Sequence, residues 1–265
     1  MIHPHTYIHP NARLATNVKV DPFTVIHQDV EIGEGTWIAS NVTIMEGARI
    51  GKNCRVFPGA VIAAIPQDLK FKGEYSTVEI GDNTTIREFV TINRGTKDRE
   101  KTVVGTNCLI QAYCHLAHDC IVGNNCVMSN NTQVAGHVII EDWAILGGMC
   151  ALHQFVRIGQ HSFISGGSLI GKDVPPFIKA ARNPLSYAGV NSVGLKRRGF
   201  SNERINDILN IYRYIYNKGM NTTQALEYIE EELPASDERD EIVTFVRESG
   251  RGIIKRFTKG SGDED

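Results

Sequence analysis

Aliphatic side chains recur at every sixth residue over most of the chain. The series runs from Ile8 to Ile62, resumes from Ile80 to Ile92, and continues from Val104 to Ile170. A strand alternates every two residues and a helix repeats every 3.6, so neither produces a strict period of six. Three six-residue units instead make one coil with three faces, and stacked coils pair as parallel strands about 4.8 Å apart. The sequence therefore predicts a hexapeptide-repeat parallel β-helix from about Ile8 to Val174.

All six cysteines occupy the fourth position after one of these aliphatic residues, where the repeat otherwise carries small side chains. Cysteines spaced in this way could form a metal or disulfide framework. They could equally be small, buried, apolar thiols at the corners of the coils. The regular spacing of positions along the repeat, which we call the lattice, favours the second interpretation, so we expect free structural thiols. They are Cys54, Cys108, Cys114, Cys120, Cys126 and Cys150.

Three acidic residues interrupt the repeat, because Asp68, Glu74 and Asp98 stand where an inward aliphatic residue is expected. An inward carboxylate would be an unpaired buried charge, which is costly. We therefore expect Ala63–Val78 and Gly95–Thr102 to leave the β-helix as loops. Long loops on a rigid scaffold frequently carry function.

The period changes after the repeat, where capping and stop signals predict a helical segment. The chain thus divides into a β-helix domain, residues 1–190, and a C-terminal helical domain, residues 191–265. We expect the flat, Val- and Ile-rich faces to promote oligomerisation, and the terminal residues 260–265 to be unordered. The predicted helices are Ser201–Lys218, Thr222–Leu233 and Asp237–Glu248.

Composition excludes several functional classes. The formal net charge is -2, whereas nucleic-acid and membrane-surface binding require a basic face. No run of about 18 apolar residues is present, so no transmembrane segment is predicted. The first residues show neither the charged nor the apolar region of a signal peptide. A cytoplasmic protein that binds no nucleic acid is the expectation.

Four histidines gather on one predicted face. Adding 18 residues moves one coil along the stack, which places His118 beside Gly136 and then Gln154, and places Asp119 beside His137. His153 lies in the next coil, and His115 lies near the preceding corner. The remaining histidines are predicted to be ordinary surface residues: His3, His5, His9, His27 and His161.

Two chemical interpretations of this histidine cluster compete. In the first, His118 is a general base oriented by Asp119, and the Gly136 N–H stabilises an oxyanion. In the second, three imidazoles bind zinc, as in hydration of carbon dioxide. Zinc–nitrogen distances are near 2.1 Å, and coils about 4.8 Å apart would stretch such a site within one chain. Ligands shared between subunits would remove that difficulty.

Polar and basic residues outside the repeat are further candidates. Gln67, Asp68 and Lys70 lie in the first predicted loop. The segment GLKRRGF places Arg197 and Arg198 near the start of the helical domain. Adjacent arginines are either a solvated face or a clamp for a diphosphate.

Several longer motifs resemble one enzyme family, the UDP-N-acetylglucosamine O-acyltransferases, which begin lipid A synthesis in Gram-negative bacteria. The resemblance covers the repeat, both loops and the helical domain. The motifs are IPQDLKFKGE (65–74), IREFVTINRGT (86–96), HLAHDC (115–120), AGHV (135–138), GGMCALHQF (147–155), DVPPF (173–177) and GLKRRGF (194–200).

The resemblance implies a left-handed parallel β-helix and a homotrimer with active sites between adjacent subunits. It also implies transfer of a 3-hydroxyacyl group from acyl carrier protein to the 3-hydroxyl of UDP-N-acetylglucosamine. No metal or coenzyme is expected beyond the pantetheine arm of the carrier protein. A related acyltransferase acting later on the sugar nucleotide, a coenzyme-A-dependent acetyltransferase and a non-enzymatic binding protein are the alternatives.

By the same resemblance, His118 is the general base, Asp119 polarises it, and Gly136 supplies the oxyanion N–H. Gly166 falls where the family limits acyl-chain length, and glycine there would leave room for a long chain. The expected substrate contacts are Gln67, Asp68, Lys70, His115, His137, His153 and Gln154, with Asn191, Arg197 and Arg198 meeting the nucleotide.

Three positions depart from the family pattern. Pro184 and Asn93 stand where some members carry histidine, and Val193 stands where some carry an acidic residue. Nucleotide contacts near these positions are therefore expected to differ.

Overall fold

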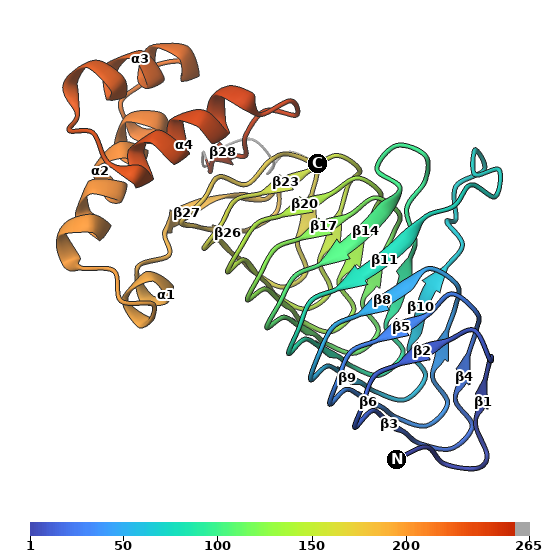
Figure 1. The fold of residues 1–265 in the computed structure, drawn as a ribbon. Helices are drawn as coiled ribbons and strands as arrows, with labels where there is room; N and C mark the ends of the chain where they lie inside the picture. Colours follow the sequence, from blue (N-terminus) through green and yellow to red (C-terminus); the bar gives the residue numbers. More distant parts are fainter. Residues whose placement is uncertain (258–265) are drawn as a thin grey trace.

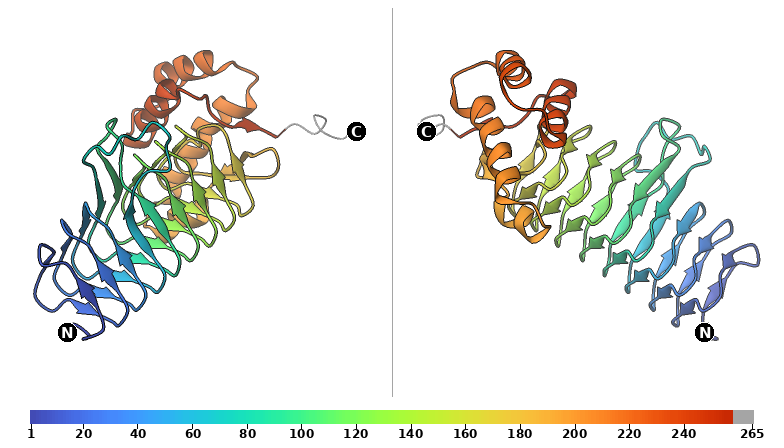
Figure 2. Two further views of the ribbon diagram at one scale, coloured as in Figure 1. Left: turned by 90° about the vertical axis from the view of Figure 1, so that its right-hand side faces the viewer. Right: turned by 60° about the vertical axis from the view of Figure 1, so that its left-hand side comes forward.

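The computed structural model describes residues 1–257, and residues 260–265, for which we predicted no order, lie outside that range. The chain forms a left-handed parallel β-helix whose coils have three strands each. Figures 1 and 2 show the coils as a long stack, with the helices gathered over its C-terminal end. The predicted fold class is confirmed.

The strands belong to three sheets, one on each face of the stack. The first sheet contains β1 (Tyr7–Ile8), β4 (Val25–Ile26), β7 (Thr43–Ile44), β10 (Val61–Ala64), β13 (Thr91–Asn93), β16 (His115–Leu116), β19 (Gln133–Val134), β22 (Ala151–Leu152) and β25 (Leu169–Ile170). The second sheet contains β2 (Arg13–Leu14), β5 (Glu31–Ile32), β8 (Ala48–Ile50), β11 (Thr77–Ile80), β14 (Lys101–Val104), β17 (Ile121–Val122), β20 (Ile139–Ile140) and β23 (Arg157–Ile158). The third sheet contains β3 (Lys19–Val20), β6 (Trp37–Ile38), β9 (Arg55–Val56), β12 (Thr85–Ile86), β15 (Leu109–Ile110), β18 (Val127–Met128), β21 (Ile145–Leu146), β24 (Phe163–Ile164), β26 (Ile178–Ala181), β27 (Ser186–Val190) and β28 (Lys255–Arg256).

Inward aliphatic side chains fill the centre of every coil, as the six-residue period predicts. Ile26, Ile44 and Ile62 are fully buried on the first sheet, where Ile26 pairs with Ile44 and Ile44 with Ile62, 18 positions apart in each case. All six cysteines are buried and free. The lattice interpretation of the cysteines is therefore confirmed.

Each coil turns at three corners, and we number the corners by the sheets that they join. The first corner joins the first sheet to the second and contains His118 and Asp119. The second joins the second sheet to the third and contains His161. The third joins the third sheet to the first and contains Gly166. Many corners use a residue in the left-handed region, such as Asp119 with φ 60°, which lets the chain turn sharply.

Both predicted loops exist, and both leave the stack at the first corner. They are shorter than predicted, because the ladder continues further on both sides of the first loop and on the C-terminal side of the second. In the first, β10 extends through Ala64 and β11 begins at Thr77, so the loop spans 65–76 rather than 63–78. The second spans 94–100 rather than 95–102, because β14 begins at Lys101. Figure 1 shows the two loops rising from the same edge.

The C-terminal region contains three predicted helices and two features that the sequence did not reveal. The predicted helices are observed as α2 (Asn202–Asn217), α3 (Thr222–Glu232) and α4 (Asp237–Glu248). A short additional helix, α1 (Ser192–Arg197), precedes them, and β28 then returns to pair with β27. After the helices, the chain therefore returns to the third sheet through β28. None of the helices in the part that the structure describes is long and apolar enough to cross a bilayer.

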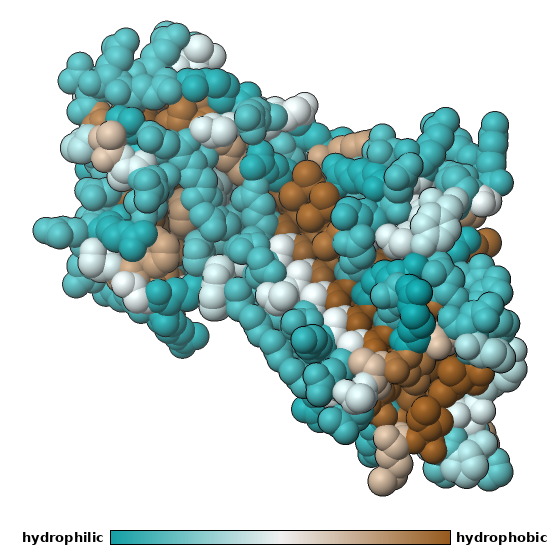
Figure 3. All heavy atoms as spheres, in the orientation of Figure 1, coloured by the Kyte–Doolittle hydropathy of each residue, from teal (hydrophilic) through white to brown (hydrophobic). Residues whose placement is uncertain are grey.

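The second sheet carries an open groove of about 750 Å³ on its outer face. Small residues line its length, including Gly33, Gly51, Gly81 and Gly105, beside the apolar Val103. Figure 3 shows a strip of white and brown, apolar or weakly polar residues running along this face between hydrophilic ones. An added Cβ at Gly33 would lie 2.5 Å from the backbone of Gly51, so close stacking of the coils requires glycine there.

Candidate active site

The first corner brings together most of the predicted site residues. Successive coils along this corner contribute the 65–76 loop, the 94–100 loop, His118 with Asp119, Gly136 with His137, and Gln154. Because a coil adds 18 residues, and more where a loop is inserted, side chains far apart in sequence become neighbours along one edge. The prediction that His118, Gly136 and His137 lie together is confirmed.

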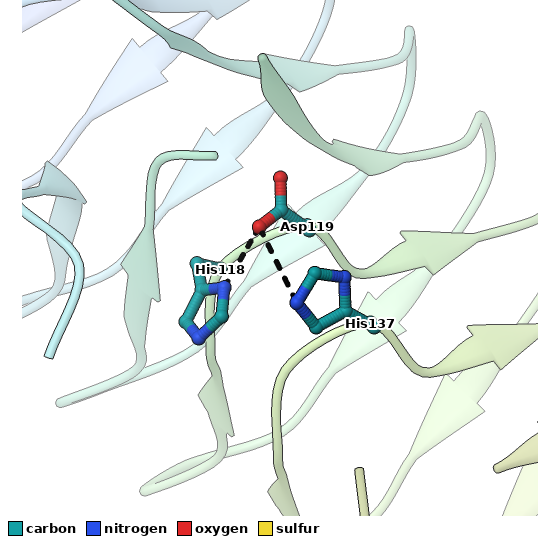
Figure 4. A group of neighbouring side chains, drawn as sticks. All are labelled: His118, Asp119 and His137. Atoms are coloured by element: carbon teal, nitrogen blue, oxygen red, sulfur yellow. Dashed lines mark hydrogen bonds and ion pairs between the residues drawn. The ribbon is translucent and has the colours of Figure 1, made fainter. Parts of the chain in front are cut away.

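His118 and Asp119 form a buried hydrogen-bonded pair. His118 Nδ1 lies 2.7 Å from Asp119 Oδ2, and Figure 4 shows the carboxylate between His118 and His137. Asp119 is fully buried and His118 is 7% exposed. A carboxylate is only an acceptor, so His118 Nδ1 donates and Nε2 keeps its lone pair. That tautomer leaves His118 Nε2 able to accept a proton.

Loop 94–100 surrounds the Asp119 carboxylate with donors. Oδ1 accepts from the N–H groups of Thr96 and Arg99, at 3.0 and 3.2 Å. Oδ2 accepts from the Thr96 hydroxyl at 2.7 Å. Burial raises the pKa of Asp119, but hydrogen bonds from His118, Thr96 and Arg99 outweigh it and hold the pKa below its ordinary value. The carboxylate therefore stays ionised inside the protein.

Gly136 lies directly against the free edge of the His118 ring. A Cβ at this position would lie 2.7 Å from His118 Cε1 and 2.8 Å from His118 Nε2. Such contacts are far inside the usual 3.5–4.0 Å between non-bonded carbons. The Gly136 N–H donates to no acceptor within residues 1–257. The geometry thus leaves a base nitrogen and an unused N–H side by side.

His137 completes the cluster from the next coil. Its ring packs edge-to-face on His118, with centroids 5.0 Å apart, and stacks on Phe155 at 4.6 Å. The Asp98 carboxylate lies 3.1 Å from His137 Nδ1, and Asp119 Oδ2 lies 3.8 Å from His137 Nε2. His137 is thus held between two carboxylates and an aromatic ring.

The same three side chains contain donor atoms within 4.8 Å of one another, which invites the zinc interpretation. Two ligands of one tetrahedral zinc lie roughly 3.4 Å apart, given metal–ligand distances near 2.1 Å. His118 Nδ1 and Asp119 Oδ2 are only 2.7 Å apart, the spacing of a hydrogen bond. Asp119 also has its oxygens occupied by loop donors. The donor set fits a hydrogen-bonded pair better than a metal site.

The remaining candidates of the first sheet lie beside this cluster. His115, on β16, lies 2.7 Å from the Thr91 hydroxyl through Nδ1, and burial lowers its pKa. His153 and Gln154 are exposed at the corner two coils beyond His118. They border an open groove of about 660 Å³, whose other lining residues are Ala135, Ala151, Leu152, Leu169, Ile170 and Gly171.

The first loop presents its polar residues to solvent. Gln67 and Lys70 are exposed, and the Asp68 carboxylate accepts from the Lys70 N–H at 3.0 Å. In addition, the Asn93 side-chain amide donates to the carbonyl of Ile65 at 3.1 Å. Asn93, one of the departures from the family pattern, therefore fastens the base of this loop.

Comparisons with known proteins agree with the geometry. A family profile described as UDP-N-acetylglucosamine O-acyltransferase, domain 2, matches residues 173–254, and one described as bacterial transferase hexapeptide matches 29–64 and 101–136. The chain is 43% identical over 260 residues to the acyl-[acyl-carrier-protein]–UDP-N-acetylglucosamine O-acyltransferase of Herminiimonas arsenicoxydans, covering 96% of this chain and 99% of that one. The enzyme of the same name from Xylella fastidiosa is 45% identical over 257 residues, covering 96% and 98%. The chain belongs to this family. It is therefore an acyltransferase.

Solved structures of the same acyltransferase family have the same fold. The UDP-N-acetylglucosamine acyltransferase of Bacteroides fragilis superposes with a TM-score of 0.94 at 52% identity, covering 96% of this chain and all of that one. The Acinetobacter baumannii structure gives 0.93 at 39% identity, covering 96% and 99%.

The residues predicted to contact the nucleotide lie elsewhere in the chain. Asn191 caps α1 and donates to the carbonyl of His161 at 2.9 Å, which places it at the second corner. Arg198 donates to the carbonyl of Trp143, also at that corner, at 3.1 Å. Arg197 and Val193 are exposed on α1. Gly166 lies at the third corner. The fold of the single chain therefore does not bring these residues to His118.

One prediction for a histidine is wrong. His161 is not a surface residue but is 8% exposed, stacked on Trp143 and Phe177, with Phe200 against its edge. The segment entering α2 covers the second corner and buries the ring. Burial, with the charge of Arg198, lowers the pKa of His161 to about 4.

Sequence reasoning missed the residues that loop 94–100 contributes to the site. These are Thr96, Asp98 and Arg99, which contact Asp119 or His137. The one available signal was the position of the loop, which interrupts the repeat one coil before HLAHDC.

Proposed function

We propose that this acyltransferase moves a 3-hydroxyacyl group from acyl carrier protein to the 3-hydroxyl of UDP-N-acetylglucosamine, the first step of lipid A synthesis, with His118 as general base. The observation that carries the proposal is the buried His118–Asp119 pair with Nε2 facing Gly136. The names of the relatives support the choice of substrates.

The reaction follows from the geometry of the pair. His118 Nε2 removes the proton of the sugar hydroxyl while the oxygen attacks the carbonyl carbon of the acyl thioester. The imidazolium that forms is stabilised by the ionised Asp119. The carbonyl oxygen becomes an oxyanion, and the Gly136 N–H donates to it. The C–S bond then breaks, and the departing thiolate takes the proton from His118 Nε2. The products are an ester and the free pantetheine thiol.

The surroundings of the pair suit the two substrates. The open groove beside Gln154 is lined mainly by apolar side chains from β22 and β25, which suits an acyl chain. Gln67, Asp68 and Lys70 offer hydrogen-bonding groups on a loop at the same corner. The thioester arrives on the pantetheine arm of the carrier protein, so no resident coenzyme is required.

A homotrimer accounts for the residues that one subunit keeps apart. In a trimer, the second or third corner of a neighbour can face the first corner of each subunit. Arg197, near the second corner, or Gly166, at the third, would then join the site that contains His118. The strip of small and apolar residues along the second sheet (Figure 3) offers a contact surface for such an assembly.

Direct assay tests the function. Purified protein is incubated with UDP-N-acetylglucosamine and 3-hydroxyacyl carrier protein, and both ester formation and thiol release are measured. His118→Ala should reduce turnover by about 10²–10⁴-fold, the usual contribution of a general base. His27→Ala, at the same corner but four coils from His118, is the matched control and should leave the rate unchanged. Equal rates for the wild type and His118→Ala would refute the base assignment.

Mixed assemblies test the sharing of sites between subunits. His118→Ala and Arg197→Ala proteins, each inactive or weak, are co-expressed and co-purified through different tags. If each site takes His118 and Arg197 from different subunits, every mixed trimer contains one intact site of three, so the co-purified protein should show about a third of the wild-type rate. Absence of any rescue would place both residues in the site of a single subunit.

A further inference from the structure

Thr96 lies in loop 94–100, outside the repeat, and is 7% exposed. It supplies two of the donors that surround Asp119, its N–H on Oδ1 and its hydroxyl on Oδ2. It thus contacts both carboxylate oxygens, one of which also meets His118. No other side-chain hydroxyl in the described part of the chain reaches this carboxylate.

The direction of the Thr96 hydroxyl is fixed. The Asp98 N–H lies 3.3 Å from Thr96 Oγ1 and donates to it. Because that N–H takes the lone-pair side of Oγ1, the hydroxyl hydrogen is directed at Asp119 Oδ2, 2.7 Å away. An ionised carboxylate needs such a donor, because an unsatisfied buried charge is costly.

Loop 94–100 is itself anchored at several points. The Arg99 guanidinium donates to the Asp119 carbonyl at 2.7 Å, and the Glu100 N–H donates to the Thr96 carbonyl at 2.7 Å. The Glu74 carboxylate accepts from the Lys97 N–H at 3.2 Å and from the Lys72 N–H at 2.8 Å. Thr96 is thus presented to Asp119 by a loop that is tied both to the β-helix and to the first loop.

We infer that Thr96 is a positioning residue for the acyl transfer, because its hydroxyl and N–H hold the Asp119 carboxylate in the orientation that keeps His118 Nε2 free. The inference rests on the proposed function. Thr96 does not touch the reacting atoms. Its effect on the reaction passes through Asp119.

This role predicts a particular pattern of kinetic effects. Thr96→Val keeps the shape and the N–H but removes the hydroxyl. A hydrogen bond to a charged group contributes about 1.5–3 kcal/mol, so kcat should fall by about tenfold or more. KM for both substrates should stay within about twofold, because the lost bond orients the base and not the substrate. Thr96→Ser retains the hydroxyl and should recover a kcat near that of the wild type.

A double-mutant cycle with Asp119→Asn separates positioning from a general structural role. If Thr96 acts through Asp119, Thr96→Val should change kcat by less than about twofold in the Asp119→Asn background. If Thr96 were merely structural, Thr96→Val would reduce kcat by the same factor in both backgrounds. Thr43→Val, which removes a hydroxyl from β7 of the first sheet, is the control and should leave kcat unchanged.

The outcomes are distinguishable. Wild-type kcat in Thr96→Val, or an equal loss with and without Asp119→Asn, would overturn the inference while leaving the acyltransferase assignment intact. A folded wild type that transfers no acyl group from these substrates would reject the proposed function itself, and the inference with it. Thermal unfolding of each variant shows that rates are compared between folded proteins. Should Thr96→Val not fold, Thr96→Ala removes the same hydroxyl and enters the same cycle.

Discussion

Replacing Gly136 by alanine should disable the base without unfolding the protein. The added Cβ would lie 2.7 Å from His118 Cε1 and 2.8 Å from His118 Nε2. Ordinary carbon contacts are about 3.5–4.0 Å, so the imidazole must retreat by roughly 1 Å. The ring cannot retreat while keeping its 2.7 Å hydrogen bond to Asp119.

The expected loss of turnover is about a hundredfold, and the expected loss of stability is too small to unfold the protein. A misplacement of about 1 Å near the chemistry lowers rates by about 10²-fold, which corresponds to about 2.7 kcal/mol of activation free energy. Overpacking costs about 1–3 kcal/mol of the free energy of unfolding. Alanine recovers about 0.4–1 kcal/mol of this by restricting the unfolded chain. Gly136→Ala should therefore remain folded but turn over about a hundredfold more slowly.

Steady-state thiol release with saturating substrates measures kcat, and urea unfolding measures stability. Gly148→Ala is the control for stability, because it alters the equivalent turn position at the third corner and meets no atom closer than 3.2 Å. A Gly136→Ala enzyme within threefold of the wild-type kcat would refute the argument that the ring and the glycine share one tightly filled space.

Four further outcomes follow from the structure. Glu74→Gln leaves one oxygen acceptor for two N–H donors, which weakens the contact between the two loops. Because the first loop carries expected substrate contacts, KM for the sugar nucleotide should rise about fivefold in initial-rate measurements, the equivalent of one hydrogen bond. Burial raises the pKa of Cys114 to about 11 and of Cys120 to about 12, so thiol reagents at pH 8 should label these residues only after unfolding. Because the pKa of His161 is lowered to about 4, only the unfolded chain gains its proton between about pH 6.5 and 4. The contribution of neutral His161 to the free energy of unfolding is thus fully present above pH 6.5 and falls by up to about 3 kcal/mol as the pH decreases to 4. His161→Phe should flatten this pH dependence in urea titrations. Gly166→Met should shift the donor preference toward shorter acyl chains in competition assays, and an unchanged preference would contradict a role in chain length.

The repeat made much of the site predictable. A fixed step of 18 residues places His118 beside Gly136 and Asp119 beside His137, and the structure confirms both neighbours. The six-residue period likewise predicts buried cysteines at the corners, which the structure confirms. Each of these conclusions concerns residues inside the lattice, where sequence position translates directly into spatial position.

Outside the lattice, sequence position carries no such information. Thr96 and Arg99 reach Asp119 through a loop whose path depends on several long-range hydrogen bonds. His161 was misjudged because its burial depends on how Phe200 and the following helix dock on the second corner. The short segments α1 and β28 lack the length that produces a recognisable period. The way in which the chains of the proposed trimer meet is likewise not encoded in the repeat.

The position of the His118–Asp119 pair along the stack determines how often local unfolding reaches it. Each coil contacts only its neighbours, so opening of the stack begins at a free end and must proceed coil by coil. His118 lies five coils beyond the exposed N-terminal strand β1, while the helices cover the opposite end. Fraying that starts at the N-terminus would have to break five successive layers before disturbing Asp119. Amide hydrogen exchange should accordingly slow from β1 toward β16, so that the chemistry occurs in the part of the molecule that opens least often.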